Sequence, residues 1–182
     1  AVPAASAGAT LGYIIDEQAE VALRYTDAGK MVLFQPETGK ILRESALPLP
    51  AGVSITAFAK GAGSVLAFGL SDGSVIVAKQ KFTVSFPDDH RTVTPDLAYP
   101  LGEKPLRLLP DNEPLRALAV QSGEDGAMVV GWGGGSDVAL LRFQKGESFL
   151  DDDAELKEEH ASLNLQTGQP QYLLLDSDMR SL

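Results

Sequence analysis

The chain has 182 residues and a mass of 19.2 kDa, which is enough for one domain with a sizeable core. Its formal net charge is −10, from 25 acidic and 15 basic side chains, which argues against a general nucleic-acid binder and against adhesion to an anionic membrane surface. The absence of cysteine excludes disulfide scaffolds, iron–sulfur clusters, cysteine-based zinc sites and cysteine nucleophiles.

The first part of the chain predicts four short strands, because apolar-rich runs alternate with turn residues. We expect strands at residues 12–15, 21–25, 31–35 and 41–46. Gly29 and Gly39 lie in two of the intervening turns, where glycine supplies a positive φ.

The same pattern then returns. The second group of predicted strands covers residues 53–59, 65–70, 75–79 and 81–86, and the third covers 115–121, 127–132, 137–143 and 156–165. A fourth group begins at 172–175. Residues 148–160 also fit a short helix with Glu155, Glu158 and Glu159 exposed.

These groups predict an all-β fold that is β-propeller-like, a partial propeller of about three four-stranded blades. The blade-like units are 12–46, 53–86 and 115–165, with a fourth started at 172. We expect residues 1–11 to be a small-residue leader or linker, and 12–182 to be a blade-like β domain and a fragment of a longer chain. Residues 87–114 are interpreted as an insertion. A β-sandwich or another all-β fold is the alternative, because its short strands would give similar spacing.

Four segments contain residues that could support chemistry or binding. The carboxylates of Asp151, Asp152, Asp153, Glu155, Glu158 and Glu159 could hold Ca²⁺, but they lack EF-hand spacing, so we interpret them as a solvated acidic loop. The glycine-rich residues 131–136 have no Walker lysine, which favours a hairpin loop, with Trp132 packed in the core. The hairpin turns around Gly29 and Gly73 define strand geometry only.

The fourth segment, Asp88, Asp89, His90 and Arg91, pairs a histidine with carboxylates but has no nucleophile partner. We therefore predict no catalytic residues, no cofactor-binding residues and no metal ligands. These four residues are instead the candidate partner-binding loop, because exposed loops commonly carry binding functions.

Several strand-and-turn strings together resemble a known family. They are residues 21–30 (VALRYTDAGK), 47–53 (LPLPAGV), 69–75 (GLSDGSV) and 92–102 (TVTPDLAYPLG). They resemble the large periplasmic, WD-repeat-like insertion domain of bacterial phosphate-type ABC transporter permeases. The resemblance implies a periplasmic location as part of an inner-membrane protein. It implies as partners the permease membrane domain of the same chain and a periplasmic phosphate-binding protein.

The expected function is a protein-interaction or docking platform of the importer permease, with no catalysis, no cofactor and no nucleic-acid partner. The first alternative is a structural spacer that self-associates as a homodimer, because an open propeller exposes strand edges. The second alternative is a propeller-type hydrolase, although no convergent acid, base and nucleophile are found in the sequence.

Overall fold

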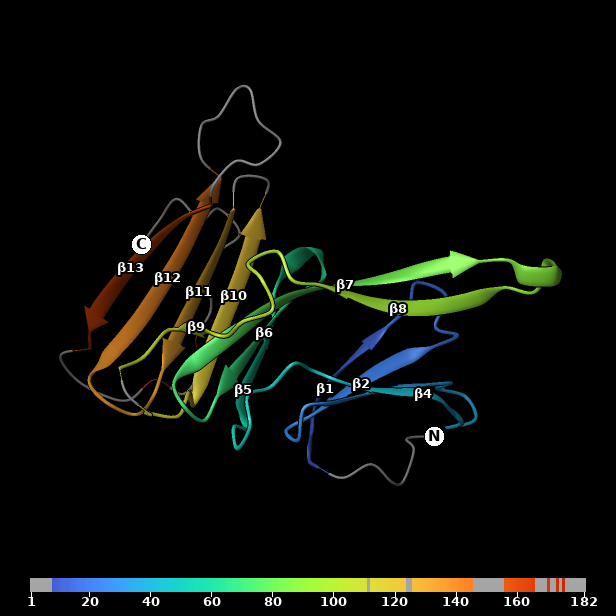
Figure 1. Cartoon of the computed structure of the whole chain (residues 1–182), viewed down its shortest axis with the longest axis horizontal. Helices are drawn as coiled ribbons and strands as arrows, with labels where there is room; N and C mark the ends of the chain where they lie inside the picture. Colours follow the sequence, from blue (N-terminus) through green and yellow to red (C-terminus); the bar gives the residue numbers. More distant parts are fainter. Residues whose placement is uncertain are drawn as a thin grey trace.

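The computed structural model describes residues 8–110, 112–123, 126–145 and 156–165, together with residues 170, 173 and 175. Within these residues the chain forms three antiparallel sheets that follow one another along the sequence (Figure 1). In each sheet the first four strands lie in the order in which they follow one another along the chain. No helix in the described part of the chain is long and apolar enough to cross a membrane.

The first sheet consists of β1 (Thr10–Ile15), β2 (Ala22–Thr26), β3 (Lys30–Phe34) and β4 (Ile41–Ala46). The second consists of β5 (Ile55–Lys60), β6 (Val65–Leu70), β7 (Ser74–Ser85) and β8 (Thr92–Ala98), with the short β9 (Leu106–Arg107) paired to β7. The third consists of β10 (Ala117–Gly123), β11 (Gly126–Trp132), β12 (Asp137–Lys145) and β13 (Leu156–Asn164). The described residues also include two 3₁₀ turns, Ala62–Ser64 and Pro87–Asp89.

Consecutive sheets pack against each other by their faces, as propeller blades do. The side chains of β6 are buried along its whole length. Alternate residues point to opposite faces of the second sheet, and a neighbouring sheet covers each face. Leu66 and Phe68 pack in the cluster shared with the first sheet, and Val65 and Ala67 in the cluster shared with the third. Three meanders stacked in this way confirm the predicted propeller-like all-β fold and differ from a two-sheet sandwich.

The cluster between the first two sheets is aromatic at its centre. Tyr25, Phe58 and Phe68 lie with ring centroids 5.3 to 5.8 Å apart, and Tyr25 and Phe68 are fully buried. Aromatic pairs at this spacing stabilise a core beyond their buried area, by about 0.5–1.5 kcal/mol each. This cluster fixes the first sheet against the second.

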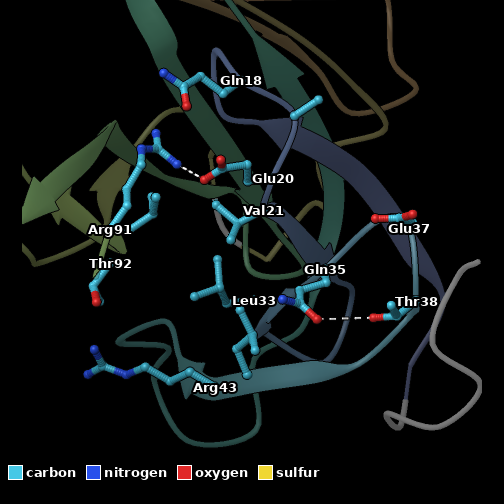
Figure 2. Close-up of a pocket in the computed structure, with 13 residues that line it drawn as sticks. Gln18, Glu20, Val21, Leu33, Gln35, Glu37, Thr38, Arg43, Arg91 and Thr92 are labelled. Carbon is cyan, nitrogen blue, oxygen red and sulfur yellow. Dashed lines mark hydrogen bonds and ion pairs between the residues drawn. The ribbon is translucent and has the colours of Figure 1, made fainter. Parts of the chain in front are cut away.

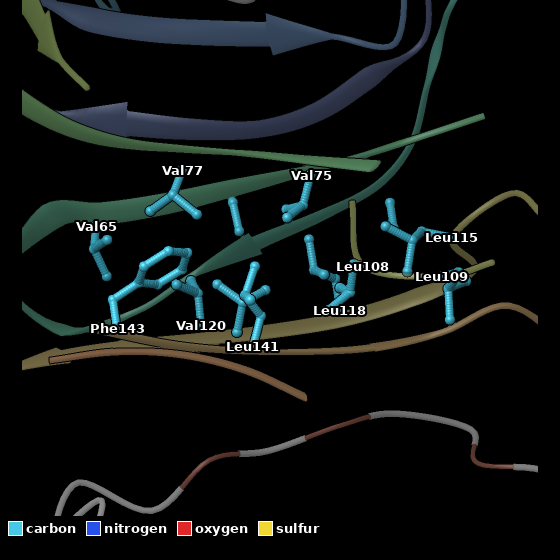
Figure 3. Packing of buried hydrophobic residues seen from close by; sticks show 13 residues of the cluster. Val65, Val75, Val77, Leu108, Leu109, Leu115, Leu118, Val120, Leu141 and Phe143 are labelled. Atoms are coloured by element: carbon cyan, nitrogen blue, oxygen red, sulfur yellow. The ribbon is translucent and has the colours of Figure 1, made fainter. Parts of the chain in front are cut away.

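The cluster between the second and third sheets is aliphatic, apart from one phenylalanine (Figure 3). Val75 and Val77 of β7 face Leu141 and Phe143 of β12 across this interface, and Leu115 fills the space beside Gly69 and Gly131. A Cβ added at Gly131 would lie 2.5 Å from a Leu115 methyl carbon, so the small residue allows this packing. Each buried leucine or valine contributes about 1.5–3 kcal/mol relative to exposure.

The far face of the third sheet has its own apolar cluster. Met128, Val130, Trp132 and Val138 are buried there, and half-buried Leu173 and Leu175 pack against the cluster. The predicted fourth unit therefore contacts the third sheet through these two leucines. The other residues of the predicted strand 172–175 lie outside the described residues.

The second sheet differs from the predicted unit 53–86. Residues 75–79 and 81–86 were predicted as two strands, but β7 is a single strand of 12 residues, because no glycine, proline or aspartate interrupts residues 75–85. The fourth strand of this sheet is β8, which lies inside the expected insertion 87–114. β8 pairs with β7 from Ser85↔Thr92 to Lys79↔Ala98.

Two smaller predictions are also corrected. The alternative helix at 148–160 is wrong where the structure describes it, because Leu156–His160 belong to β13 and pair with β12. Residues 146–155 lie outside the described residues. The proposed leader 1–11 overlaps β1, because Thr10 and Leu11 are already in that strand and Ala9 accepts a hydrogen bond from the Asp27 N–H at 3.0 Å.

The turn between β6 and β7 shows why its sequence is Ser71-Asp72-Gly73-Ser74. Gly73 has φ +84°, and a Cβ there would lie 2.9 Å from the Glu113 carbonyl oxygen. Asp72 accepts hydrogen bonds from the Ser74 N–H at 3.0 Å and the Ser74 hydroxyl at 2.5 Å. Burial acts to raise the pKa of Asp72, but these bonds and the Arg107 charge outweigh it and hold the pKa below its usual value.

Candidate functional site

The outer half of β7 and all of β8 form a two-stranded ribbon that projects away from the stacked sheets (Figure 1). The Pro87–Asp89 turn closes its tip. Three of the four predicted partner-binding residues, Asp88, Asp89 and His90, are exposed at this tip. Asp88 and Asp89 have φ of +50° and +61°, a left-handed conformation in which aspartate is tolerated.

Arg91, the fourth predicted residue, points away from the tip. Its guanidinium lies 3.4 Å from a carboxylate oxygen of Asp16 and also pairs with Glu20 (Figure 2). Asp16 is buried, and its other carboxylate oxygen accepts a hydrogen bond from the Val21 N–H at 2.9 Å. Arg91 therefore ties the ribbon to the loop between β1 and β2.

An open pocket of about 700 Å³ lies between this ribbon and the first sheet (Figure 2). Its charged lining residues have both signs: Glu20 and Glu37 against Arg43 and Arg91. Because Arg91 is neutralised by two carboxylates, the pocket offers no concentrated positive charge for an anion such as phosphate. Within the described residues no three histidine, aspartate or glutamate side chains gather as a metal site requires.

A second hollow lies beside the outer half of β7. It is a groove of about 600 Å³ between the end of β1 and the outer half of β7. Three large apolar side chains in its lining are exposed to solvent: Ile15 by 55%, Val84 by 42% and Phe86 by 65%. Exposed apolar side chains gathered at one place commonly mark an interaction surface.

Sequence reasoning missed this groove. Phe82, Val84 and Phe86 lie in the predicted strand 81–86, but of these three side chains only Phe82 packs against the core. The signal that could have found the groove is the length of the run, because a strand much longer than its neighbours must extend beyond the sheet. Ile15 comes from a distant strand, and only the tertiary structure places it in the same groove.

The other predicted segments are accounted for structurally. Trp132 is buried as predicted, and its indole N–H donates to the Gly135 carbonyl at 2.8 Å across the β11–β12 turn. Residues 151–153 and 155 of the acidic stretch lie outside the described residues. Glu158 lies 2.5 Å from His160, and Glu159 lies 3.3 Å from Lys157, all within β13.

Comparison with known proteins concerns the fold alone. No protein-family model matches the chain, and no curated protein matches it. It is similar to Hsv2 of Kluyveromyces lactis at 12% identity, with a TM-score of 0.47 over 90% of this chain and 50% of that chain. It is also similar to the β-propeller domain of Cps50 (Swd1) from Myceliophteria thermophila, at 12% identity and a TM-score of 0.42 over 87% of this chain and 40% of that one.

A third similar structure is that of the RRP9 WD40 repeats, at 12% identity and a TM-score of 0.39 over 92% of this chain and 63% of that one. The chain thus spans 40–63% of the solved structures compared here. The fold is β-propeller-like. The order and packing of the three sheets define this fold, since the TM-scores to the three solved structures are all below 0.5.

Proposed function

We propose that this propeller-like domain is a protein-docking platform with no catalytic role. The observation that carries the proposal is the projecting β7–β8 ribbon, which presents an exposed tip and an exposed Phe86 beyond the packed sheets. A ribbon that packs against the cluster between the first two sheets through Phe82 and Val93, and leaves its tip exposed, suits contact with another protein better than it suits chemistry on a small substrate.

In its finer form, the proposal is that the domain belongs to the periplasmic part of a phosphate-type ABC importer permease. There it would dock the periplasmic phosphate-binding protein near the permease membrane domain of the same chain. The support for this form is the resemblance of residues 21–30, 47–53, 69–75 and 92–102 to that family. The net charge of −10 and the neutralised Arg91 favour docking over capture of free phosphate.

The test is a titration of the chain with the phosphate-binding protein, followed by light scattering. We expect a complex that is weakened by the tip substitutions Asp88→Ala, Asp89→Ala and His90→Ala, because these side chains are exposed where the ribbon ends. Glu103→Ala is the matched control, since Glu103 is also exposed but lies away from the tip. Absence of any complex would overturn the docking proposal in its finer form.

Self-association is a second candidate, favoured by the outer strands. Among the described residues β4 and β13 each pair with one strand only, so each leaves an open edge. Ile41 and Leu42 on β4 are 38% and 42% exposed, and Leu163 on β13 is 62% exposed. Open edges tend to pair with another chain. A homodimer that Leu42→Lys or Leu163→Lys converts to a monomer would support this function.

A further inference from the structure

One edge of the projecting ribbon is unpaired. β6 pairs with β7 only as far as Val65↔Lys79, whereas β8 and β9 both pair along the opposite edge of β7. Along residues 80–85, β7 pairs with β8 on one edge only. Its other edge, which β6 occupies up to Lys79, has no strand partner among the described residues. Backbone N–H and C=O groups along such an edge can accept another strand.

The opposite edge of the ribbon is less suited to strand addition. Pro95 lies in the middle of β8, opposite Phe82. Proline is tolerated in a sheet where its missing N–H faces outward from an edge strand. With Pro95 so placed, the outer edge of β8 lacks a donor at its centre, while residues 80–85 of β7 contain no proline.

The free edge of β7 forms one wall of the groove of about 600 Å³. Residues 14–18 form the other wall, and Lys60 and Ser64 also line the groove. Because the groove is bounded on both sides, it suits one extended segment better than the two-stranded ribbon of a second copy of the chain. Ile15, Val84 and Phe86 give this chain apolar contacts.

The charge of the groove differs from that of the whole chain. Its lining has three basic side chains, Lys60, Lys81 and Arg91, against the two acidic side chains of Asp16 and Glu17. Arg91 pairs with Asp16 in the β1–β2 loop. No ion pair of Lys60 or Lys81 occurs among the described residues, although the chain has a net charge of −10. These two lysines are therefore available to acidic side chains of a partner.

We propose that this groove binds an extended segment of a partner protein as an added strand on the free edge of β7. The segment alternates apolar residues, which contact Ile15, Val84 and Phe86, with acidic residues, which pair with Lys60 and Lys81. The inference rests on the proposed docking function and names the chemistry of the partner that this function requires.

The test uses a fluorescent peptide of alternating valine and glutamate, and a matched peptide of valine and lysine, with the full 182-residue chain. We expect saturable binding of the valine–glutamate peptide, with amide chemical-shift changes at residues 80–86. Val84→Asp and Phe86→Ser should each weaken this binding about tenfold. Both side chains are exposed, so the variants should fold.

Charge reversal provides an independent readout. The double variant Lys60→Glu, Lys81→Glu should lose affinity for the valine–glutamate peptide and gain affinity for the valine–lysine peptide. Lys40→Glu is the matched control, because Lys40 is exposed in the β3–β4 turn and does not line the groove. No binding, or binding without shifts at residues 80–86, would overturn the inference. A dimer that Val84→Asp dissociates would also overturn it, in favour of a second copy of the chain as occupant.

The groove and the docking function can fail separately. If the phosphate-binding protein binds and Val84→Asp leaves its affinity unchanged, the groove inference is wrong and the docking function stands. If the valine–glutamate peptide binds the groove but the phosphate-binding protein does not bind the chain, the proposed importer partner is wrong and the groove inference stands.

Discussion

The hydroxyl of Tyr25 donates a hydrogen bond to the side-chain carbonyl of Gln80, and this bond joins the first sheet to the second. Both side chains are buried, Tyr25 completely and Gln80 to 3% exposure. Gln80 in turn donates from its amide nitrogen to the Lys81 carbonyl at 2.9 Å. Gln80 is the first residue of β7 beyond its pairing with β6, so this bond fastens the base of the projecting ribbon.

Tyr25→Phe should reduce the free energy of unfolding by about 1–3 kcal/mol, because it leaves the buried Gln80 carbonyl without its donor. Urea denaturation followed by circular dichroism measures the change. Tyr13→Phe is the matched control, since Tyr13 is 40% exposed and should change stability by less than about 0.5 kcal/mol. Equal effects of the two substitutions would contradict a special role for the Tyr25–Gln80 bond.

The buried hydroxyl of Tyr25 should also make the folded protein less stable at alkaline pH. Burial, and to a lesser extent the charge of Tyr99, raises the pKa of Tyr25 above its usual value of about 10. The unfolded chain therefore ionises first, and the stabilisation that is complete below about pH 10 is lost as the pH rises toward the folded-state pKa. Between about pH 10 and 11, the free energy of unfolding of the native chain should fall by up to about 1.4 kcal/mol more than that of the Tyr25→Phe variant. Parallel pH slopes for the two proteins would refute this assignment.

Arg91→Ala should loosen the ribbon from the β1–β2 loop. The substitution removes the cation beside the buried Asp16 carboxylate, which would keep only its backbone donors. We expect a loss of about 1–2 kcal/mol, below the usual cost of breaking a fully buried pair, because Arg91 is partly exposed. Hydrogen exchange should quicken in residues 92–98. Arg43→Ala is the control from the same pocket, and comparable exchange in both variants would argue against the tether.

Gly73→Ala should destabilise the hairpin between β6 and β7. An alanine at φ +84° is strained by about 1–2 kcal/mol, and its Cβ would also lie 2.9 Å from the Glu113 carbonyl oxygen. Thermal unfolding should therefore show a lower midpoint than that of Gly52→Ala. Gly52 has φ +76°, but no atom lies within 4 Å of the added Cβ. Gly52→Ala therefore measures the cost of the backbone strain without a steric contact. A midpoint for Gly73→Ala at or above that of Gly52→Ala would show that the close contact has no cost.

Local patterns were sufficient for most strands. Residues 41–46 and 65–70 were predicted with the observed bounds, because glycines with positive φ lie in the turns beside these strands. Trp132 was predicted to be a core residue because it alternates with Val130, and both are buried. The strand-and-turn period was enough to predict stacked sheets of four strands, since, apart from the added β9, each sheet is a local meander whose strands pair with their neighbours in sequence.

The candidate site was only partly predictable. Asp88, Asp89 and His90 were predicted to lie in an exposed polar loop, and the structure places them at the exposed end of a ribbon. Whether they bind a partner remains a prediction. Arg91 belongs to the same segment of sequence, yet its carboxylate partners are supplied by a loop about 70 residues earlier in the chain.

The amino-acid sequence by itself determined the acidic surface charge, the absence of cysteine chemistry and the series of short strands, because these depend on composition and on neighbours along the chain. The tertiary structure decided that Tyr25 meets Gln80 and that Ile15 shares a groove with Val84 and Phe86. These contacts join residues more than 50 positions apart. They arise from how the faces of consecutive sheets pack, and no local pattern of residues encodes that packing.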